Sequence, residues 1–192
     1  MPLKQKLAVR NTMKEKGEVM AARFGHEDSL VASGGNDGVV RIYNTVKSTK
    51  LSQVNTNVKD KETNQDTPVN TLRWRPYSDK IESVGAVVLT ANTNGHLFQF
   101  NAKTGKQIWR SSEPDNQIFA IDYAQDGTYF ATAGKDNTIR IYDEMTKKTS
   151  HNLKGELRHK KGHNNRIFSV KFKPENPVIL ASGGWDQNVG LY

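Results

Sequence analysis

The sequence predicts an all-β protein built from four copies of one four-stranded unit. Residues 33–43, 90–100, 132–142 and 182–192 align without gaps, each with a Ser or Thr followed four residues later by Asp or Asn. The Asp or Asn positions, 37, 94, 136 and 186, are 57, 42 and 50 residues apart, a spacing typical of repeated β units with loop insertions. Apolar residues alternate with a period of two, and helical periodicity is nowhere convincing.

Each unit is expected to begin with an inner strand, at residues 19–24, 69–74, 118–123 and 167–172. In the last of these, both faces carry apolar residues, as expected of a strand that lies between two neighbouring sheets. A hairpin follows, with an apolar run, a turn rich in Gly, Asn and Asp, and an alternating second strand. A less apolar outer strand is expected at residues 51–54, 106–109 and 149–153 because the outer edge faces solvent.

Gly162 and His163 ahead of an inner strand, the turn Asp and an aromatic residue closing the third strand resemble the WD-repeat β-propeller family. The resemblance covers residues 18–192 and implies blades at 18–54, 68–110, 117–153 and 163–192, the last incomplete. The expected fold is therefore a partial propeller, about four blades of a seven-bladed ring. Further chain or a partner is expected to supply the remaining blades, and residues 1–17 to hold a strand, 5–12, that closes the last blade.

The same resemblance implies a buried hydrogen-bonded tetrad in the fourth unit, made of His163, Ser182, Asp186 and Tyr192. All four units end in Tyr or Phe where the family has Trp, and the first three lack the Gly-His pair, so no unit holds the complete tetrad. Asp37 and Asp136 are expected to cap their turns by accepting backbone N–H groups. We interpret these six residues as structural.

Composition narrows the class of protein. With 35% hydrophobic and 25% charged residues the chain resembles a folded protein, and it has no apolar run of the roughly 20 residues that a membrane span needs. We expect an intracellular, cytoplasmic protein, and a cytoskeletal or ciliary surface and the nucleus are left open as alternatives. The net charge of +8 favours acidic partners such as nucleic acid, anionic lipid or an acidic protein surface. The basic run at 158–161 is interpreted as a solvated loop rather than a phosphate site.

The sequence lacks the residues expected for several kinds of catalytic and metal chemistry. There is no cysteine, which excludes thiolate chemistry and disulfides. His151, His159 and His163 lie in predicted loops, so we expect no metal, and residues 104–106 lack the rest of a phosphate-binding loop. An enzyme of this fold would need a polar cluster along the central channel, and we identified none in the inner strands. The prediction is a protein without catalytic activity or cofactor.

Binding is expected at the rim where inner strands begin and second strands turn into third strands. The positions that the resemblance places there are Arg166, Phe168 and Trp185; Gln117, Phe119 and Lys135; Pro68, Asn70 and Thr93; and Glu18, Met20 and Asn36. Exposed Trp, Phe and Arg dominate interface energetics, so the first two sets are the partner-binding candidates. The alternative is that Phe119 and Phe168 pack between blades.

The leading hypothesis is a non-catalytic protein-interaction scaffold that binds a peptide or an assembly subunit at this rim. The alternative is a propeller that binds nucleic acid through the same aromatic and basic residues, which would make affinity fall steeply with salt. The polar stretches 44–68 and 77–85 are interpreted as spacers, with a partner-binding loop as the alternative.

Overall fold

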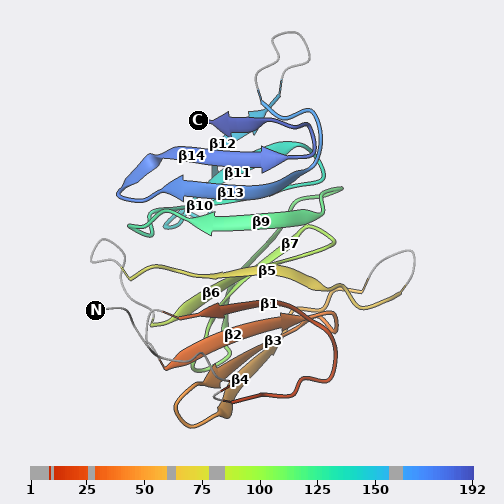
Figure 1. Ribbon diagram of the computed structural model, residues 1–192, viewed down its shortest axis with the longest axis vertical. Coiled ribbons are helices and arrows are strands. Elements are labelled where there is room, and N and C mark those ends of the chain that lie inside the picture. The colour runs from red at the N-terminus through yellow and green to blue at the C-terminus, as the bar shows by residue number, and fades with distance from the viewer. Residues whose placement is uncertain (1–8, 10, 26–28, 60–63, 78–84, 156–161) are drawn as a thin grey trace.

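A computed structural model describes residues 9, 11–25, 29–59, 64–77, 85–155 and 162–192 of the chain. The described residues form fifteen β-strands in four antiparallel sheets and no helix (Figure 1). The fold class expected from the sequence is confirmed: the protein is all-β.

Each sheet follows the chain order from an inner to an outer strand. The first sheet consists of β1 (Val19–Phe24), β2 (Leu30–Gly35), β3 (Val39–Asn44) and β4 (Thr49–Asn55). The second consists of β5 (Val69–Trp74), β6 (Val87–Asn92), β7 (His96–Asn101) and β8 (Gln107–Ser112). The third consists of β9 (Ile118–Tyr123), β10 (Tyr129–Gly134), β11 (Thr138–Asp143) and β12 (Thr149–Lys154). The fourth has three strands, β13 (Ile167–Lys173), β14 (Asn176–Gly184) and β15 (Val189–Leu191).

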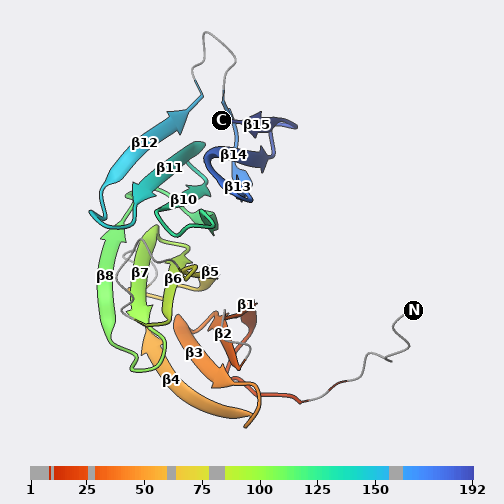
Figure 2. The ribbon, with the colours of Figure 1, turned by 90° about the vertical axis from the view of Figure 1, so that its left-hand side faces the viewer.

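The sheets stand side by side in an arc (Figure 2), with β4, β8 and β12 on its convex side and β1, β5 and β13 on its concave side. This is the arrangement of a partial β-propeller. The inner strands expected at 19–24, 69–74 and 118–123 coincide with β1, β5 and β9, and β13 continues one residue further than expected. Most of the closing strand expected at residues 5–12, like the basic run at 158–161, lies outside the described residues.

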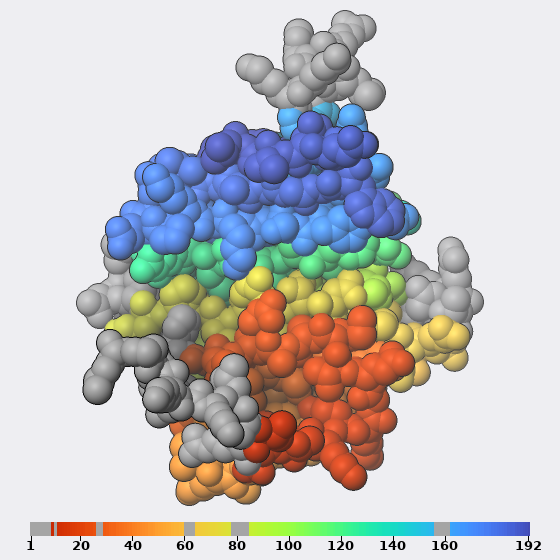
Figure 3. All heavy atoms as spheres, in the orientation of Figure 1, coloured from red at the N-terminus to blue at the C-terminus, as the bar shows by residue number. Residues whose placement is uncertain are grey.

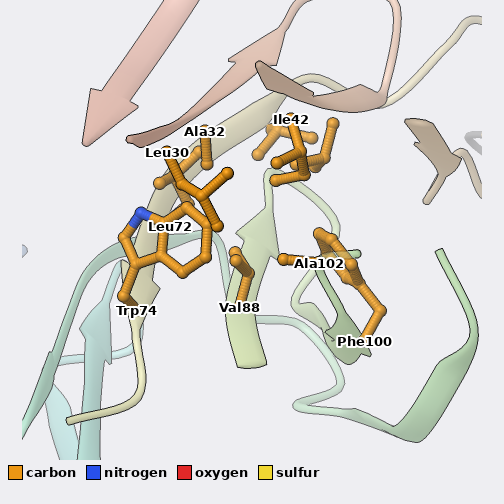
Figure 4. Close-up of a cluster of buried hydrophobic side chains, with 10 residues drawn as sticks. Leu30, Ala32, Ile42, Leu72, Trp74, Val88, Phe100 and Ala102 are labelled. Carbon is orange, nitrogen blue, oxygen red and sulfur yellow. The ribbon is translucent and has the colours of Figure 1, made fainter. Parts of the chain in front are cut away.

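The apolar core lies between neighbouring sheets rather than inside any one of them. Between the first and second sheets, Trp74 and Phe100 pack with Leu30 and Ile42 (Figure 4). The indole Nε1 of Trp74 also donates a hydrogen bond to the carbonyl oxygen of Arg23, at 2.9 Å. Because each large side chain buried in this way contributes roughly 1.5–3 kcal/mol, these junctions hold the sheets together.

The junction of the second and third sheets combines aromatic packing with a buried carboxylate. Trp109 of β8 meets Phe130 edge-on, with ring centroids 5.8 Å apart. Glu144, whose side chain is fully buried, accepts hydrogen bonds from Arg75 and Gln99 of the second sheet at 3.1 and 2.8 Å, and pairs with Lys147 at 2.5 Å. A buried carboxylate is stable only when it is paired in this way, so this contact also fixes the orientation of the two sheets.

Candidate functional site

Four side chains form a continuous row at one end of the third and fourth sheets. Phe119 and Phe168, each the second residue of its inner strand, stack with ring centroids 4.8 Å apart and an interplanar angle of 18°. Trp185, directly after β14, lies 5.0 Å from Phe168, and the Arg166 guanidinium lies 5.3 Å above the indole ring. We call Phe119, Phe168, Trp185 and Arg166 the rim row.

The backbone holds this row in place. The Trp185 N–H donates to the carbonyl oxygen of Arg166 at 2.9 Å, which ties the turn after β14 to the start of β13. The third sheet repeats the contact, since the Lys135 N–H donates to the carbonyl oxygen of Gln117 at 3.0 Å. The first and second sheets have it as well, so the same hydrogen bond joins a predicted rim pair in each of the four sheets.

The rim row is accessible. Trp185 is 62% exposed and Phe168 is 40% exposed, and both border a hollow of about 510 Å³ lined further by Gln187, Asn188 and Val189. Phe119 is half-buried and Lys135 exposed. Phe119 and Phe168 contact each other across the junction of two sheets while retaining exposed surface, so their geometry has features of both alternatives drawn from the sequence.

His163, Ser182 and Asp186 form a hydrogen-bonded chain in the fourth sheet. The imidazole contacts Asp186 through Nδ1 at 2.8 Å and Ser182 through Nε2 at 2.7 Å. Burial by itself would raise the pKa of Asp186, but hydrogen bonds from His163 and from the backbone N–H groups of Asn164 and Asn188 outweigh it and lower the pKa to about 2. The carboxylate is therefore charged at neutral pH and orients the imidazole ring.

Two glycines allow this chain to form. A Cβ on Gly184 would lie 2.6 Å from the carbonyl oxygen of Arg166, and one on Gly190 would lie 2.7 Å from both the Ser182 hydroxyl and the Tyr192 hydroxyl. Such distances are far below van der Waals contact, so a larger residue at either position would displace these groups. Tyr192, the fourth expected member, thus lies beside Ser182 with its hydroxyl toward Gly190.

The sequence interpretation missed a related network in the first and third sheets, where a glutamate occupies the place of the histidine. In the third sheet Glu113 accepts hydrogen bonds from Thr132 Oγ1 at 2.5 Å and Tyr142 OH at 2.9 Å, and it pairs with Arg140 at 3.1 Å. Arg140 in turn contacts Asp136 at 2.5 Å. The buried carboxylate and the partly buried guanidinium therefore compensate each other.

Glu15 has the same role in the first sheet. It accepts from Ser33 Oγ at 2.6 Å and Tyr43 OH at 2.7 Å, and pairs with Arg41 at 2.9 Å, while Arg41 contacts Asp37 at 2.5 Å. Burial, together with the Glu15 contact, raises the pKa of Tyr43 to about 12. The signal was spacing: Thr132 follows Glu113 by 19 residues, as Ser182 follows His163, and Ser33 follows Glu15 by 18.

Comparison with known proteins agrees with this geometry. Residues 77–175 match the family profile described as the anaphase-promoting complex subunit 4 WD40 domain, and residues 9–44 match the WD domain, G-beta repeat. The chain belongs to the WD-repeat family.

Among relatives of this WD-repeat chain, eukaryotic translation initiation factor 3 subunit I of Taeniopygia guttata is 35% identical over 78 residues, 41% of this chain and 22% of the relative. APC/C activator protein CDC20 of Saccharomyces cerevisiae is 28% identical over 187 residues, 92% of this chain and 27% of the relative. The chain thus spans about a quarter of the length of these relatives. A solved structure of a mitotic checkpoint complex matches with a TM-score of 0.73 at 20% identity, over 94% of this chain and 49% of that one, and shows the shared fold.

The turns of the WD repeats are capped by acidic or amide side chains. Asp37 accepts from the backbone N–H of Val39 at 3.1 Å, and Asp136 accepts from that of Thr138 at 3.1 Å. In the second sheet Asn92 accepts from the N–H groups two and four residues later, at 3.1 and 2.9 Å. The alignment of the repeats did not identify Asn92, which lies two residues before the repeated Asp or Asn position.

The inner strands of this WD-repeat chain do carry a polar cluster, and the expectation of none was wrong. Asp122 of β9 pairs with Arg73 of β5 at 3.2 Å and with Lys171 of β13 at 2.6 Å, and it accepts from the Phe172 N–H at 3.1 Å. These three charged residues stand 49 residues apart along the sequence, each in a different inner strand. Only the arc of the sheets brings three consecutive inner strands within ion-pair distance.

No group of three or more His, Cys, Asp and Glu side chains suited to a metal ion occurs within the part of the chain that the structure describes. His159 lies outside that part. No helix among the described residues is long and apolar enough to cross a membrane.

Proposed function

We propose that this chain is a non-catalytic protein-interaction scaffold whose rim row binds a peptide or a subunit of an assembly. The observation that carries the proposal is the exposed, continuous stack of Phe119, Phe168, Trp185 and Arg166. As part of the same proposal, the units at 18–54, 68–110, 117–153 and 163–192 are the blades that present this surface, and Lys135 and Gln117 extend it on the third blade.

The residues of the rim row are suited to binding. A tryptophan that is 62% exposed leaves much of its apolar surface in water, and a partner that covers it gains that burial free energy. Arg166 is already stacked on the indole, so little side-chain entropy remains to be lost when it binds. Buried Trp and Arg anchors typically contribute about 2 kcal/mol or more each to an interface.

The relatives support a role in assemblies. Two of the matched names denote a subunit of an initiation factor and an activator of a complex, and the matched structure is a multiprotein checkpoint complex. A scaffold that presents a rigid rim on packed sheets is consistent with such membership, since binding then requires little reorganisation of the platform.

The test is an affinity purification of the full-length protein from its native extract, at low and high salt. The rim variant is Trp185→Ala with Arg166→Glu. The matched control is Phe24→Ala with Lys173→Glu, which also removes an exposed aromatic ring and reverses one charge, the lysine at the opposite end of β13.

A protein partner that is retained by the control at high salt and lost by the rim variant is the expected result. Loss of the partner on raising salt alone, with nucleic acid in the eluate, would favour the nucleic-acid-binding alternative, because phosphate contacts release counterions. Equal recovery of every partner by the rim variant and the control would refute binding at the rim row.

A further inference from the structure

The outer strands of the second and third sheets carry different aromatic residues at one repeated position. Trp109 is the third residue of β8, where it pairs with Gln99. His151 is the third residue of β12, where it pairs with Ile141. Gln99 and Ile141 are each the fourth residue of the neighbouring strand, β7 or β11. The junctions that these two sheets make with the next sheet can therefore be compared residue by residue.

At the junction of the second and third sheets, the repeated position fills the space between the sheets with an indole ring. Trp109 meets Phe130 and Tyr142 of the third sheet edge-on, with ring centroids 5.8 and 6.2 Å apart. Phe130 and Tyr142 stack on each other with centroids 4.8 Å apart. The outer strand of one sheet thus covers a pair of large side chains on the next sheet.

The junction of the third and fourth sheets has a matching pair of side chains but a smaller ring opposite it. Leu180 and Tyr192 exchange two backbone hydrogen bonds of 3.0 Å. They stand two residues before and ten residues after the repeated Ser182, as the aromatic pair of the third sheet does relative to its repeated Thr. His151, which is exposed, occupies the position of Trp109. An imidazole therefore stands where the preceding junction has an indole.

A groove of about 340 Å³ lies between the third and fourth sheets at this place. In Figure 3 the fourth sheet (blue) forms the end of the stack of sheets, next to β9 of the third sheet (green). His151 and Tyr192 line the groove together with apolar side chains of both sheets: Tyr129, Ile141, Leu153, Phe172, Val178 and Leu180. Tyr129, Ile141 and Leu153 pack against the core of this junction and are only partly buried. The groove therefore leaves apolar surface of both sheets accessible.

The groove is apolar at two positions where the preceding junction is polar. Gln99 donates a hydrogen bond to the Tyr123 hydroxyl at 2.8 Å. Ile141 and Phe172 stand at the same strand positions as these two residues, the fourth of β11 and the sixth of β13. Water in contact with such side chains has few polar partners, so an apolar ring displaces it at little cost.

We propose that this groove binds the planar aromatic side chain of a partner protein, specifically an indole, in the position that Trp109 fills one junction earlier. The repeat itself identifies the occupant, because the same register position, facing the equivalent pair of side chains, holds an indole in the preceding junction. The volume is sufficient, since an apolar cavity of about 150 Å³ already accepts benzene. Concave apolar sites with a few polar groups are also the usual binding sites of ring-shaped ligands.

The groove is separate from the rim row. Val178 lines the groove near the start of β14, whereas Trp185 directly follows the end of that strand. The two surfaces therefore lie at opposite ends of β14, and the proposal goes beyond the function proposed for the rim row. A variant of the rim row, Trp185→Ala, is expected to leave binding in the groove unchanged.

The experiment is an NMR titration of the full chain with N-acetyl-tryptophanamide, followed through the methyl signals of Ile141 and Leu153. We expect saturable binding with a dissociation constant on the order of 1 mM, the range accessible to a single side chain. N-acetyl-leucinamide, which is apolar but not planar, should bind about fivefold more weakly or less. Free indole is titrated in parallel to distinguish a side chain from a small molecule.

His151→Trp supplies the ring from the chain itself. It should weaken binding by about tenfold or more and raise the thermal midpoint by about 2–6 °C, because it fills the groove. The matched control is Asn152→Trp, which adds the same ring to the same strand on its opposite face, since successive side chains alternate. The control should bind as the natural chain does, within about twofold, and should keep its midpoint within about 1 °C.

Four results would overturn the proposal. The first is a natural chain that does not bind N-acetyl-tryptophanamide, or binds only free indole. The second is equal affinity for N-acetyl-leucinamide. The third is a His151→Trp variant with a lowered midpoint or with unchanged binding. The fourth is a dimer of the natural chain that His151→Trp abolishes in analytical ultracentrifugation, which would assign the groove to a second copy of the chain.

Discussion

Replacing Glu113 by alanine removes an acceptor on which four donors converge. Thr132, Tyr142, Arg140 and Asn116 contact the carboxylate at 2.5, 2.9, 3.1 and 2.6 Å, and the residue is only 2% exposed. The substitution leaves Arg140 without its buried counter-charge and the hydroxyl groups without an acceptor. Breaking a buried ion pair from one side typically costs 3–5 kcal/mol, so we expect a loss of about 3–5 kcal/mol in the free energy of unfolding.

The conservative change Glu113→Gln separates charge from shape. Glutamine keeps the size and one carbonyl oxygen but replaces the other acceptor by a donor and removes the charge opposite Arg140. Because hydrogen bonds to charged groups contribute about 1.5–3 kcal/mol, we expect a smaller loss, of roughly 1–3 kcal/mol. Glu18→Ala, at an exposed position, is the control and should change stability by less than about 0.5 kcal/mol.

The measurement is urea unfolding followed by tryptophan fluorescence, with the midpoint compared at constant slope. Arg140→Ala and the double variant complete a thermodynamic cycle, in which residues that share a network couple by roughly 0.5–3 kcal/mol. A loss below 1 kcal/mol for Glu113→Ala, or additive effects of the two single changes, would refute the assignment of Glu113 as the histidine substitute of this sheet.

Three further predictions concern the packing of the sheets. The folded-state pKa of Asp186 is about 2, below its ordinary 3.8. The contribution of this carboxylate to the free energy of unfolding is therefore complete above about pH 4 and is lost as the pH falls through 2. Urea titrations at a series of pH values should show a loss of about 1–2 kcal/mol in the natural chain and none in Asp186→Asn. Trp74→Phe removes the 2.9 Å hydrogen bond to the Arg23 carbonyl and should lower the free energy of unfolding by about 1 kcal/mol or more; an unchanged midpoint would contradict it. Gly184→Ala places a Cβ 2.6 Å from the Arg166 carbonyl oxygen and should cost about 1–3 kcal/mol in thermal unfolding, so a neutral effect would show that the turn relaxes freely.

Much of the local structure could be predicted from the sequence. Period-two alternation located β1, β5 and β9 to the residue, because successive side chains of a strand point to opposite faces of its sheet. The Asp four residues after the repeated Ser or Thr located the turns, since its carboxylate accepts a backbone N–H from two residues later. The outer strands were less well placed: β8 runs from Gln107 to Ser112, beyond the expected 106–109, because solvent-facing strands lack a strong apolar pattern.

The strand periodicity did not predict contacts between segments that lie far apart in the sequence. The glutamates at 15 and 113 stand in segments without strand periodicity, and nothing in their local sequence shows that they reach the Ser or Thr of the following hairpin. The signal in the sequence is their spacing to that residue, 18 and 19, which is close to the 19 residues from His163 to Ser182. The residues of the rim row were predicted from the family resemblance, but their stacking depends on how the third and fourth sheets pack.

The sequence by itself determined the strand periodicity, the turns and the repeated unit, because these depend on residues a few positions apart along one chain. The tertiary structure decided which charges compensate each other: Asp122 neutralises Arg73 and Lys171, 49 residues away on either side. Ion pairing falls off over a few ångströms, and distances of that kind between separate blades exist only once the sheets have closed on one another.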